Sequence, residues 1–133
     1  MYAVIFEVQP KTELSAQDYF DLAAELRPEL EAIEGFISVE RFSSLSDEGK
    51  FLSISFWRDE ESLMRWREHH QHRQAQRKGR EEIFKDYRIR VAKVIRDYGM
   101  TNRKEAPQHL SCIGKLVGNK IISCECIERT ARV

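Results

Sequence analysis

Three of the four histidines in this chain lie in one basic stretch, WREHHQHRQAQRKGR, which runs from Trp66 to Arg80. If residues 60–77 form one continuous helix at about 100° per residue, one inward-facing arc holds several side chains that could do chemistry. That arc comprises Leu63, Trp66, His70, Gln74 and Arg77. On the same wheel His72 points away and His69 lies to one side, so the three histidines do not form one cluster.

His70 is the residue of this stretch best suited to catalysis, because an imidazole titrates near neutral pH and can act as a general base. We therefore predict His70 and Trp66 as a catalytic pair. The competing interpretation is a boundary histidine hydrogen bonded to a backbone carbonyl or to a carboxylate such as Glu7 or Glu40. His69 and His72 supply at most two ligands with no third, so no metal site is expected here.

Composition narrows the function classes. The 133 residues suit one domain, and 22 Lys and Arg balance 22 Asp and Glu, so no overall charge favours nucleic acid or an anionic membrane as a partner. The first residues, MYAVIFEV, lack the charged segment and cleavage site of a secretory signal, and no membrane-spanning run follows. The three cysteines, Cys112, Cys124 and Cys126, are an odd number and are expected to be reduced. We expect a cytoplasmic protein.

The hydrophobic patterns alternate between strand and helix periods. A helix is predicted to begin at a capping box formed by Ser15 and Asp18, to be kinked or divided at Pro28, and to stop at Gly35. The second helix is predicted to run from Arg58 to about Asp86, with an interruption at Gly79. Alternating apolar residues predict four strands, over 2–8, 36–43, 50–57 and 87–98.

The order βαββαβ favours a ferredoxin-like α+β fold, a four-stranded antiparallel sheet with both helices on one face. Both faces of the strands over 50–57 and 87–98 are partly apolar, so a monomer would expose aromatic surface. Two sheets facing each other in a homodimer would cover it. We predict one domain over 1–98 and a C-terminal extension over 99–133, with a short β-hairpin that turns at Gly118-Asn119.

Three motifs carry a family resemblance over residues 2 to about 100. They are Glu34-Gly35-Phe36 at the start of the second strand, Phe56-Trp57-Arg58-Asp59-Glu60-Glu61 after the third, and Trp66 on the following helix. In these motifs the chain resembles the antibiotic biosynthesis monooxygenase family. The resemblance implies a dimeric α+β barrel with a pocket between sheet and helices in each subunit. Members include cofactor-independent oxygenases of quinols or polyketide-like phenols, and related haem-degrading monooxygenases.

The resemblance implies oxidation of a small aromatic or quinol compound with O2, without a bound metal or flavin. Such a reaction needs a base, which is His70, and exclusion of water from the reactive anion. The remaining candidates are predicted to bind the substrate. The aromatic ones would form the walls of the pocket, and the arginines would counter the negative charge that develops on the substrate. These candidates are Phe6, Phe36, Phe56, Tyr87, Arg77 and Arg90.

Haem degradation stays an alternative, although two positions depart from the haem-degrading relatives. Those relatives use an asparagine on the first strand, where this chain has only Val4, Phe6 and Val8 on the predicted pocket face. Their axial histidine corresponds to a position near Gln76. A haem cofactor therefore requires a nearby histidine to substitute.

Other classes also stay open. A small-ligand-binding or accessory protein without catalysis would use the same pocket. RNA binding is disfavoured because the third strand offers only Phe51 for base stacking, followed by Ser53 and Ser55. In the extension, a zinc site made by His109 and the three cysteines is disfavoured because H-x2-C with C-x-C is not a common zinc spacing.

Overall fold

A computed structural model describes residues 1–107, 112–117 and 120–126 of the chain. The chain divides into two compact units, Met1–Ile95 and Arg96–Val133. In chain order the elements are β1 (Tyr2–Pro10), α1 (Glu13–Glu25), α2 (Arg27–Ala32), β2 (Phe36–Ser43), β3 (Phe51–Trp57), α3 (Glu60–Glu68), α4 (His70–Lys78), the π-helix η1 (Gly79–Ile83), β4 (Phe84–Lys93), β5 (Cys112–Val117) and β6 (Lys120–Cys126).

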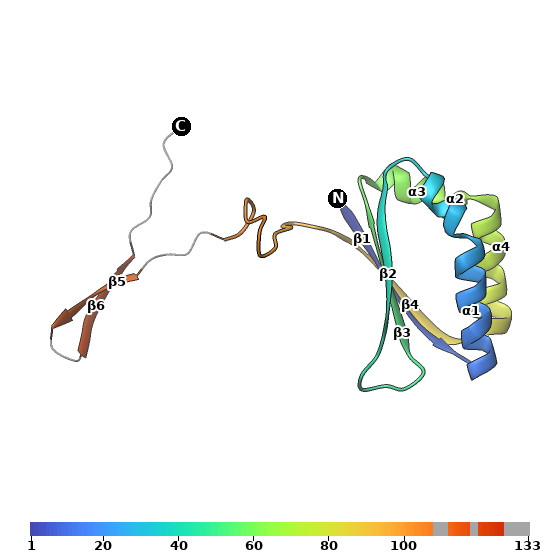
Figure 1. Cartoon of the computed structure of the whole chain (residues 1–133), viewed down its shortest axis with the longest axis horizontal. Helices are drawn as coiled ribbons and strands as arrows, with labels where there is room; N and C mark the ends of the chain where they lie inside the picture. The colour runs from blue at the N-terminus through green and yellow to red at the C-terminus, as the bar shows by residue number, and fades with distance from the viewer. Residues whose placement is uncertain (108–111, 118–119, 127–133) are drawn as a thin grey trace. The chain divides into compact units, whose positions relative to one another are not determined.

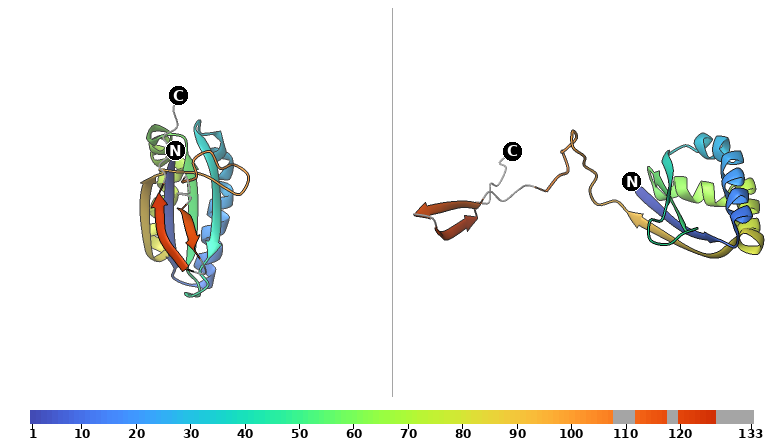
Figure 2. Two further views of the ribbon diagram at one scale, coloured as in Figure 1. Left: turned by 90° about the vertical axis from the view of Figure 1, so that its left-hand side faces the viewer. Right: turned by 60° about the horizontal axis from the view of Figure 1, so that its bottom comes forward.

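The first unit is a four-stranded sheet in the order β2-β3-β1-β4, and all three of its strand pairings are antiparallel. The helices lie on one face of this sheet, which we call the helix face (Figure 1; Figure 2, right). The opposite face, here called the open face, has no helix over it in the described part of the unit. The predicted ferredoxin-like α+β arrangement is confirmed.

The first helical segment is divided, as predicted, around Pro28: α1 ends at Glu25, and Pro28 lies in the first turn of α2. Its predicted start at Ser15 is wrong. Thr12 is the N-cap, and its hydroxyl accepts a hydrogen bond from the Ser15 backbone N–H at 3.1 Å. Ser15 thus lies in the first turn, because an N-cap side chain satisfies a donor that comes three residues later.

The second helical segment differs more from the prediction. The helix predicted to be continuous over 60–77 breaks at His69, which has the extended angles φ −58° and ψ 131°. A five-residue π-helical turn follows α4, and β4 begins at Phe84 and ends at Lys93, earlier at both ends than predicted. The break at His69 changes which side chains of α4 face the sheet.

The core of the first unit lies between the helix face and the helices. Val8, Tyr19 and Ile83 are buried against one another, and five partly buried side chains pack around them. These are Phe6, Phe20, Leu22, Phe51 and Phe84. Since β1 and β3 pair without a register shift, residues directly opposite each other share a face, and Val8 and Phe51 both point towards the helices.

The second unit contains the antiparallel pair β5 and β6, in which Cys112 lies opposite Cys126 in the register. His109 and the predicted turn residues Gly118 and Asn119 lie outside the described residues. The two-residue turn therefore stays a prediction, and the disfavoured zinc site is not tested by the described residues.

Candidate functional site

Trp66 and His72 form the most intimate contact between an aromatic ring and a titratable side chain in the described part of the chain. Their rings stack with centroids 4.2 Å apart and an interplanar angle of 16°. The ring of His69 lies nearly parallel to the same indole, at 5.7 Å and 22°. Trp66 lies on α3 and His72 lies on α4. The interruption of the helix at His69 therefore brings the two rings together.

The predicted pairing of His70 with Trp66 is not what the structure shows. His70 is exposed, whereas His72, predicted to point away, is partly buried and covers the indole. The reason is the extended ψ of His69, which rotates the residues that follow relative to α3. Gln74 and Arg77, on the same predicted inward arc, are also exposed. The catalytic role assigned to His70 stays a prediction.

The hydrogen bonds of His72 define the state of its ring. Its Nδ1 lies 2.9 Å from the backbone carbonyl oxygen of Trp66. Because a carbonyl only accepts, this contact requires the hydrogen on Nδ1 and leaves the lone pair on Nε2. The side-chain amide nitrogen of Gln76, 3.2 Å from the same Nδ1, is a donor and requires the opposite tautomer; the shorter contact to the carbonyl favours the hydrogen on Nδ1. Burial lowers the pKa of His72, the hydrogen bond to the Trp66 carbonyl opposes this change, and the nearby His69 lowers the pKa further. The lowered pKa favours the neutral ring, whose free nitrogen can accept a proton but holds it less tightly than an ordinary histidine does.

His69 ties the same site to α2. Its Nε2 lies 3.6 Å from a carboxylate oxygen of Glu29. Its Nδ1 is buried and has no hydrogen-bond partner among the described residues. A buried donor or acceptor without a partner is energetically costly, and His69 places such an atom next to Trp66.

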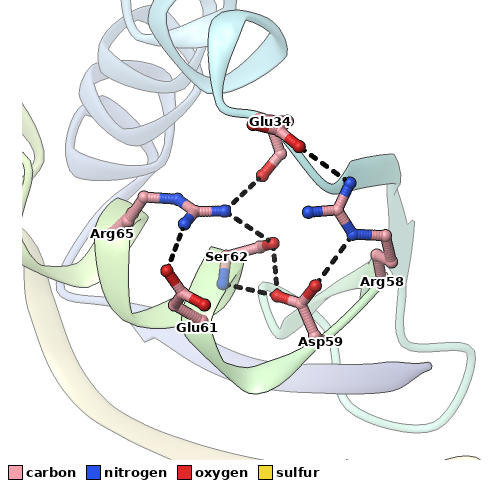
Figure 3. A network of polar contacts seen from close by, with 6 residues as sticks. All are labelled: Glu34, Arg58, Asp59, Glu61, Ser62 and Arg65. Carbon is pink, nitrogen blue, oxygen red and sulfur yellow. Dashed lines mark hydrogen bonds and ion pairs between the residues drawn. The ribbon is translucent and has the colours of Figure 1, made fainter.

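A polar network holds α3, and with it Trp66, against the loop before β2 (Figure 3). Asp59 caps α3 by accepting hydrogen bonds from the backbone N–H of Ser62 at 2.8 Å and from its hydroxyl at 2.5 Å. Arg65 donates to the backbone carbonyl of Glu34 at 3.1 Å and to the carboxylate of Glu61 at 2.8 Å. These bonds fix the N-terminal half of the helix that carries Trp66.

Charge and backbone conformation strengthen that network. The hydrogen bond from the Ser62 hydroxyl, together with one from Arg58, holds the pKa of the Asp59 carboxyl well below its usual range. Gly35 has φ +90°, and a Cβ there would lie 2.0 Å from the Ser62 hydroxyl oxygen. The Glu34-Gly35-Phe36 and Arg58-Asp59 motifs thus touch each other, and both act by positioning α3.

The predicted aromatic walls lie partly on the helix face. Phe6 and Tyr87 meet there with ring centroids 6.0 Å apart, and Phe36 packs on Trp57 at 5.4 Å. Phe6 also contacts Tyr19 of α1 at 6.5 Å. Tyr87 is 41% exposed, so the helices leave part of this aromatic surface accessible.

Three other predicted binding residues lie elsewhere. Phe56 is opposite Ala3 in the register and therefore on the open face, away from Phe6. Arg90 is also on the open face, where it forms an ion pair with Glu7. Arg77 lines a surface hollow together with residues that belong to α4 and η1. These are Gln74, Lys78, Glu81 and Glu82.

A second hollow lies on the open face, lined by residues that include Ile5, Phe42 and Leu52. Neither this hollow nor the one at Arg77 includes Trp66 or His72. Phe6, Leu63 and Trp66 are each partly exposed.

Sequence patterns alone do not point to His72, Tyr19 or Arg41 as site residues. Tyr19 and Arg41 lie on the helix side of the sheet, and His72 covers Trp66. Tyr19 could have been found, because it belongs to the apolar residues that recur at helical spacing and are therefore expected to face the sheet. Arg41 gives no such signal, because an arginine within an alternating strand is normally assigned to solvent. Placing His72 correctly requires knowing that the helix is interrupted at His69, and the residues His69-His70 give no sign of an interruption.

The donor atoms near Trp66 do not suit a haem. Gln76, near the position that the family resemblance assigns to the axial histidine of haem-degrading relatives, has its amide nitrogen 3.2 Å from His72 Nδ1. His72 itself packs flat on Trp66, and His70 is exposed. In the described residues, no group of three or more His, Cys, Asp or Glu side chains could hold a metal ion. None of the helices there combines the length and apolar character that crossing a membrane requires.

Comparison with known proteins identifies the family. The family model for antibiotic biosynthesis monooxygenases matches residues 1–78. A protein of Pyricularia oryzae named jasmonate monooxygenase ABM is 50% identical over 94 residues, which cover 71% of this chain and 43% of that protein. The chain spans about half the length of the curated relatives it matches.

Solved structures agree in fold. Rv0793 from Mycobacterium tuberculosis matches with a TM-score of 0.64 at 15% identity, covering 74% of this chain and 98% of that one. SnoaB, a cofactor-independent oxygenase from Streptomyces nogalater, matches with a TM-score of 0.59 at 11% identity, covering 72% and 94%. With the sheet order, the helix face and the family match in agreement, the chain belongs to the antibiotic biosynthesis monooxygenase family.

Proposed function

We propose that this protein is a monooxygenase that oxidises a small organic compound with O2 beside Trp66, with His72 as general base and without a bound metal or flavin. The observation that carries the proposal is the imidazole of His72, stacked on the indole and hydrogen bonded through Nδ1 to the Trp66 carbonyl. The family match and the name of the Pyricularia relative support the reaction type. The catalytic unit is the domain over 1–98, and residues 99–133 are an extension to it.

An aromatic or quinol substrate makes the reaction balance without a cofactor. His72 removes a phenolic proton, and the resulting anion is electron-rich enough to react with O2. One oxygen atom enters a ring carbon, and the other leaves as water with two hydrogens from the substrate. The substrate thus supplies all the electrons. Hydroxylation of a saturated carbon, as in jasmonate, needs two further electrons from an added donor.

The test is oxygen uptake by the full chain, measured with an oxygen electrode against a panel of quinols and naphthols, and against jasmonate with and without NADPH. We expect His72→Ala to lower the rate by about 10²–10⁴-fold, the usual contribution of a general base. Arg73→Ala, an exposed neighbour on α4, is the control.

His70→Ala decides between the two histidines. Loss of uptake in this variant with full activity of His72→Ala would return the role of base to His70 and refute our assignment. Absence of uptake with every compound would favour the second candidate, a ligand-binding protein without turnover. Trp66 is the sensor for that case, since a ligand near its ring alters its emission.

We further propose a homodimer in which two open faces meet. Ile5, Leu52 and Ile54 form an apolar strip there, flanked by Phe42, which is 45% exposed. Light scattering after size exclusion tests the assembly. Ile54→Arg is expected to give monomers, whereas Leu45→Arg, on a fully exposed loop residue, is expected to leave the dimer intact. A wild-type monomer would refute the proposal.

A further inference from the structure

Arg41 is an arginine on the side of the sheet that faces the helices. It lies opposite Ser53 of β3, and Ser53 lies opposite Phe6 of β1, so the three side chains form one row across the helix face. Arg41 is partly buried and Ser53 is buried. A cation is therefore placed on the helix face beside Ser53, in the row that ends at the aromatic ring of Phe6.

The guanidinium is oriented by Tyr19 of α1. Its Nε donates to the Tyr19 hydroxyl at 3.3 Å, and its central carbon lies 5.7 Å from the centre of the tyrosine ring. Tyr19 is only 7% exposed and belongs to the core, so it is a rigid partner. Held through Nε, the guanidinium keeps its two terminal nitrogens as a planar pair of donors.

The charge of Arg41 lacks a counterion where one is expected. Within residues 1–107, only Arg41 and Arg65 among the arginines are not exposed, and Arg65 pairs with Glu61. No carboxylate of the described residues lies within ion-pair distance of Arg41. Partly buried charges are normally paired, because desolvation is costly when no opposite charge compensates it.

We propose that Arg41 binds the carboxylate of the substrate, so that the substrates of this enzyme are small monocarboxylic acids. Two terminal guanidinium nitrogens match the two oxygens of a carboxylate in a bidentate pair. The apolar remainder of the molecule then lies along the aromatic side chains of the helix face, beginning with Phe6. This inference rests on the proposed function, because it takes the helix face as the substrate site.

A binding measurement tests the inference without any turnover. Isothermal titration of the full chain compares jasmonate, a carboxylic acid, with its methyl ester, which has the same carbon skeleton and no charge. A charge-assisted pair predicts that the acid binds about 10–100-fold more tightly than the ester. Arg41→Gln is expected to abolish this difference while affecting the ester little.

Arg90→Gln is the matched control, since it removes an arginine from the open face of the same sheet. It should keep the preference for the acid. Equal binding of acid and ester by the wild type, including no binding of either, would overturn the inference even if Arg41→Gln failed to fold. A preference that persists in Arg41→Gln would overturn it as well.

The outcomes separate this inference from the proposed function. Preference for the acid that depends on Arg41, without oxygen uptake on any compound, would uphold carboxylate recognition and refute the oxygenase. Oxygen uptake with no preference for the acid would uphold the oxygenase and refute the role of Arg41.

Discussion

Gly35 offers a quantitative test of how α3 is positioned. Its φ of +90° is a conformation that L-residues rarely adopt, and a Cβ added there would lie 2.0 Å from the Ser62 hydroxyl oxygen and 2.8 Å from the Ser62 Cβ. Ser62 is completely buried and is held by Asp59 and Arg65, so it has little freedom to move away. Gly35→Ala therefore combines a backbone penalty with a clash.

Gly49→Ala isolates the backbone part. Gly49 also has positive φ, +78°, but nothing lies within 4 Å of an added Cβ. The left-handed region costs about 1–2 kcal/mol, and the lower chain entropy of unfolded alanine returns about 0.4–1 kcal/mol. Gly49→Ala should thus destabilise by about 1 kcal/mol. Overpacking adds about 1–3 kcal/mol, so Gly35→Ala should cost about 2–4 kcal/mol.

Urea denaturation followed by tryptophan fluorescence measures both variants, because Trp57 and Trp66 both lie in the first unit. Equal losses for Gly35→Ala and Gly49→Ala would refute the argument that Ser62 occupies the space beside Gly35. The Ser62→Gly background gives a further check. There the cost of Gly35→Ala should fall towards that of Gly49→Ala, since the clashing atoms are gone.

Three further outcomes are expected. Because burial lowers the pKa of His72 in the folded state, the unfolded chain binds the proton more readily. The contribution of neutral His72 to the free energy of unfolding is therefore complete well above about pH 6.5 and is lost as pH falls towards the folded pKa. Measured against pH, the free energy of unfolding of His72→Gln should lack this loss. Ile83→Ala, at a residue 1% exposed, should lower the free energy of unfolding by about 2–5 kcal/mol in urea titrations, and a loss below about 1 kcal/mol would contradict its place in the core. Thr12→Ala removes the cap of α1 and should cost about 1 kcal/mol by the same assay, whereas Thr12→Ser should cost much less.

The fold could be predicted from sequence because its signals are local. Apolar side chains recur at every second position in the run from Tyr2 and in the run over 50–57. This pattern predicts strands without reference to the rest of the chain. Pro28 divides its helix because the pyrrolidine ring lacks a backbone N–H, which is again a local property. Once element types and order were known, topological rules left few arrangements, and the observed sheet is one of them.

The site was less predictable because it depends on phase and register. A helical wheel assumes unbroken helical geometry, so one non-helical residue shifts the predicted direction of every side chain after it. The extended conformation of His69 therefore leaves His70 exposed and His72 partly buried, the reverse of the prediction. Phe56 and Arg90 were grouped with Phe6 from residue type alone, but strand pairing puts them on the opposite face.

The sequence by itself determined the element types, their order, the family motifs at Gly35 and Asp59, and the supply of aromatic and basic side chains. Those properties depend on neighbours within a few residues. Only the tertiary structure decided that His72 covers Trp66 and that Arg41 lies against Tyr19 without a carboxylate partner in the described residues. The physical reason is that each contact joins two segments of the chain. The interruption of the helix at His69 sets the relative orientation of one pair and strand register sets that of the other, and neither can be read from one segment alone.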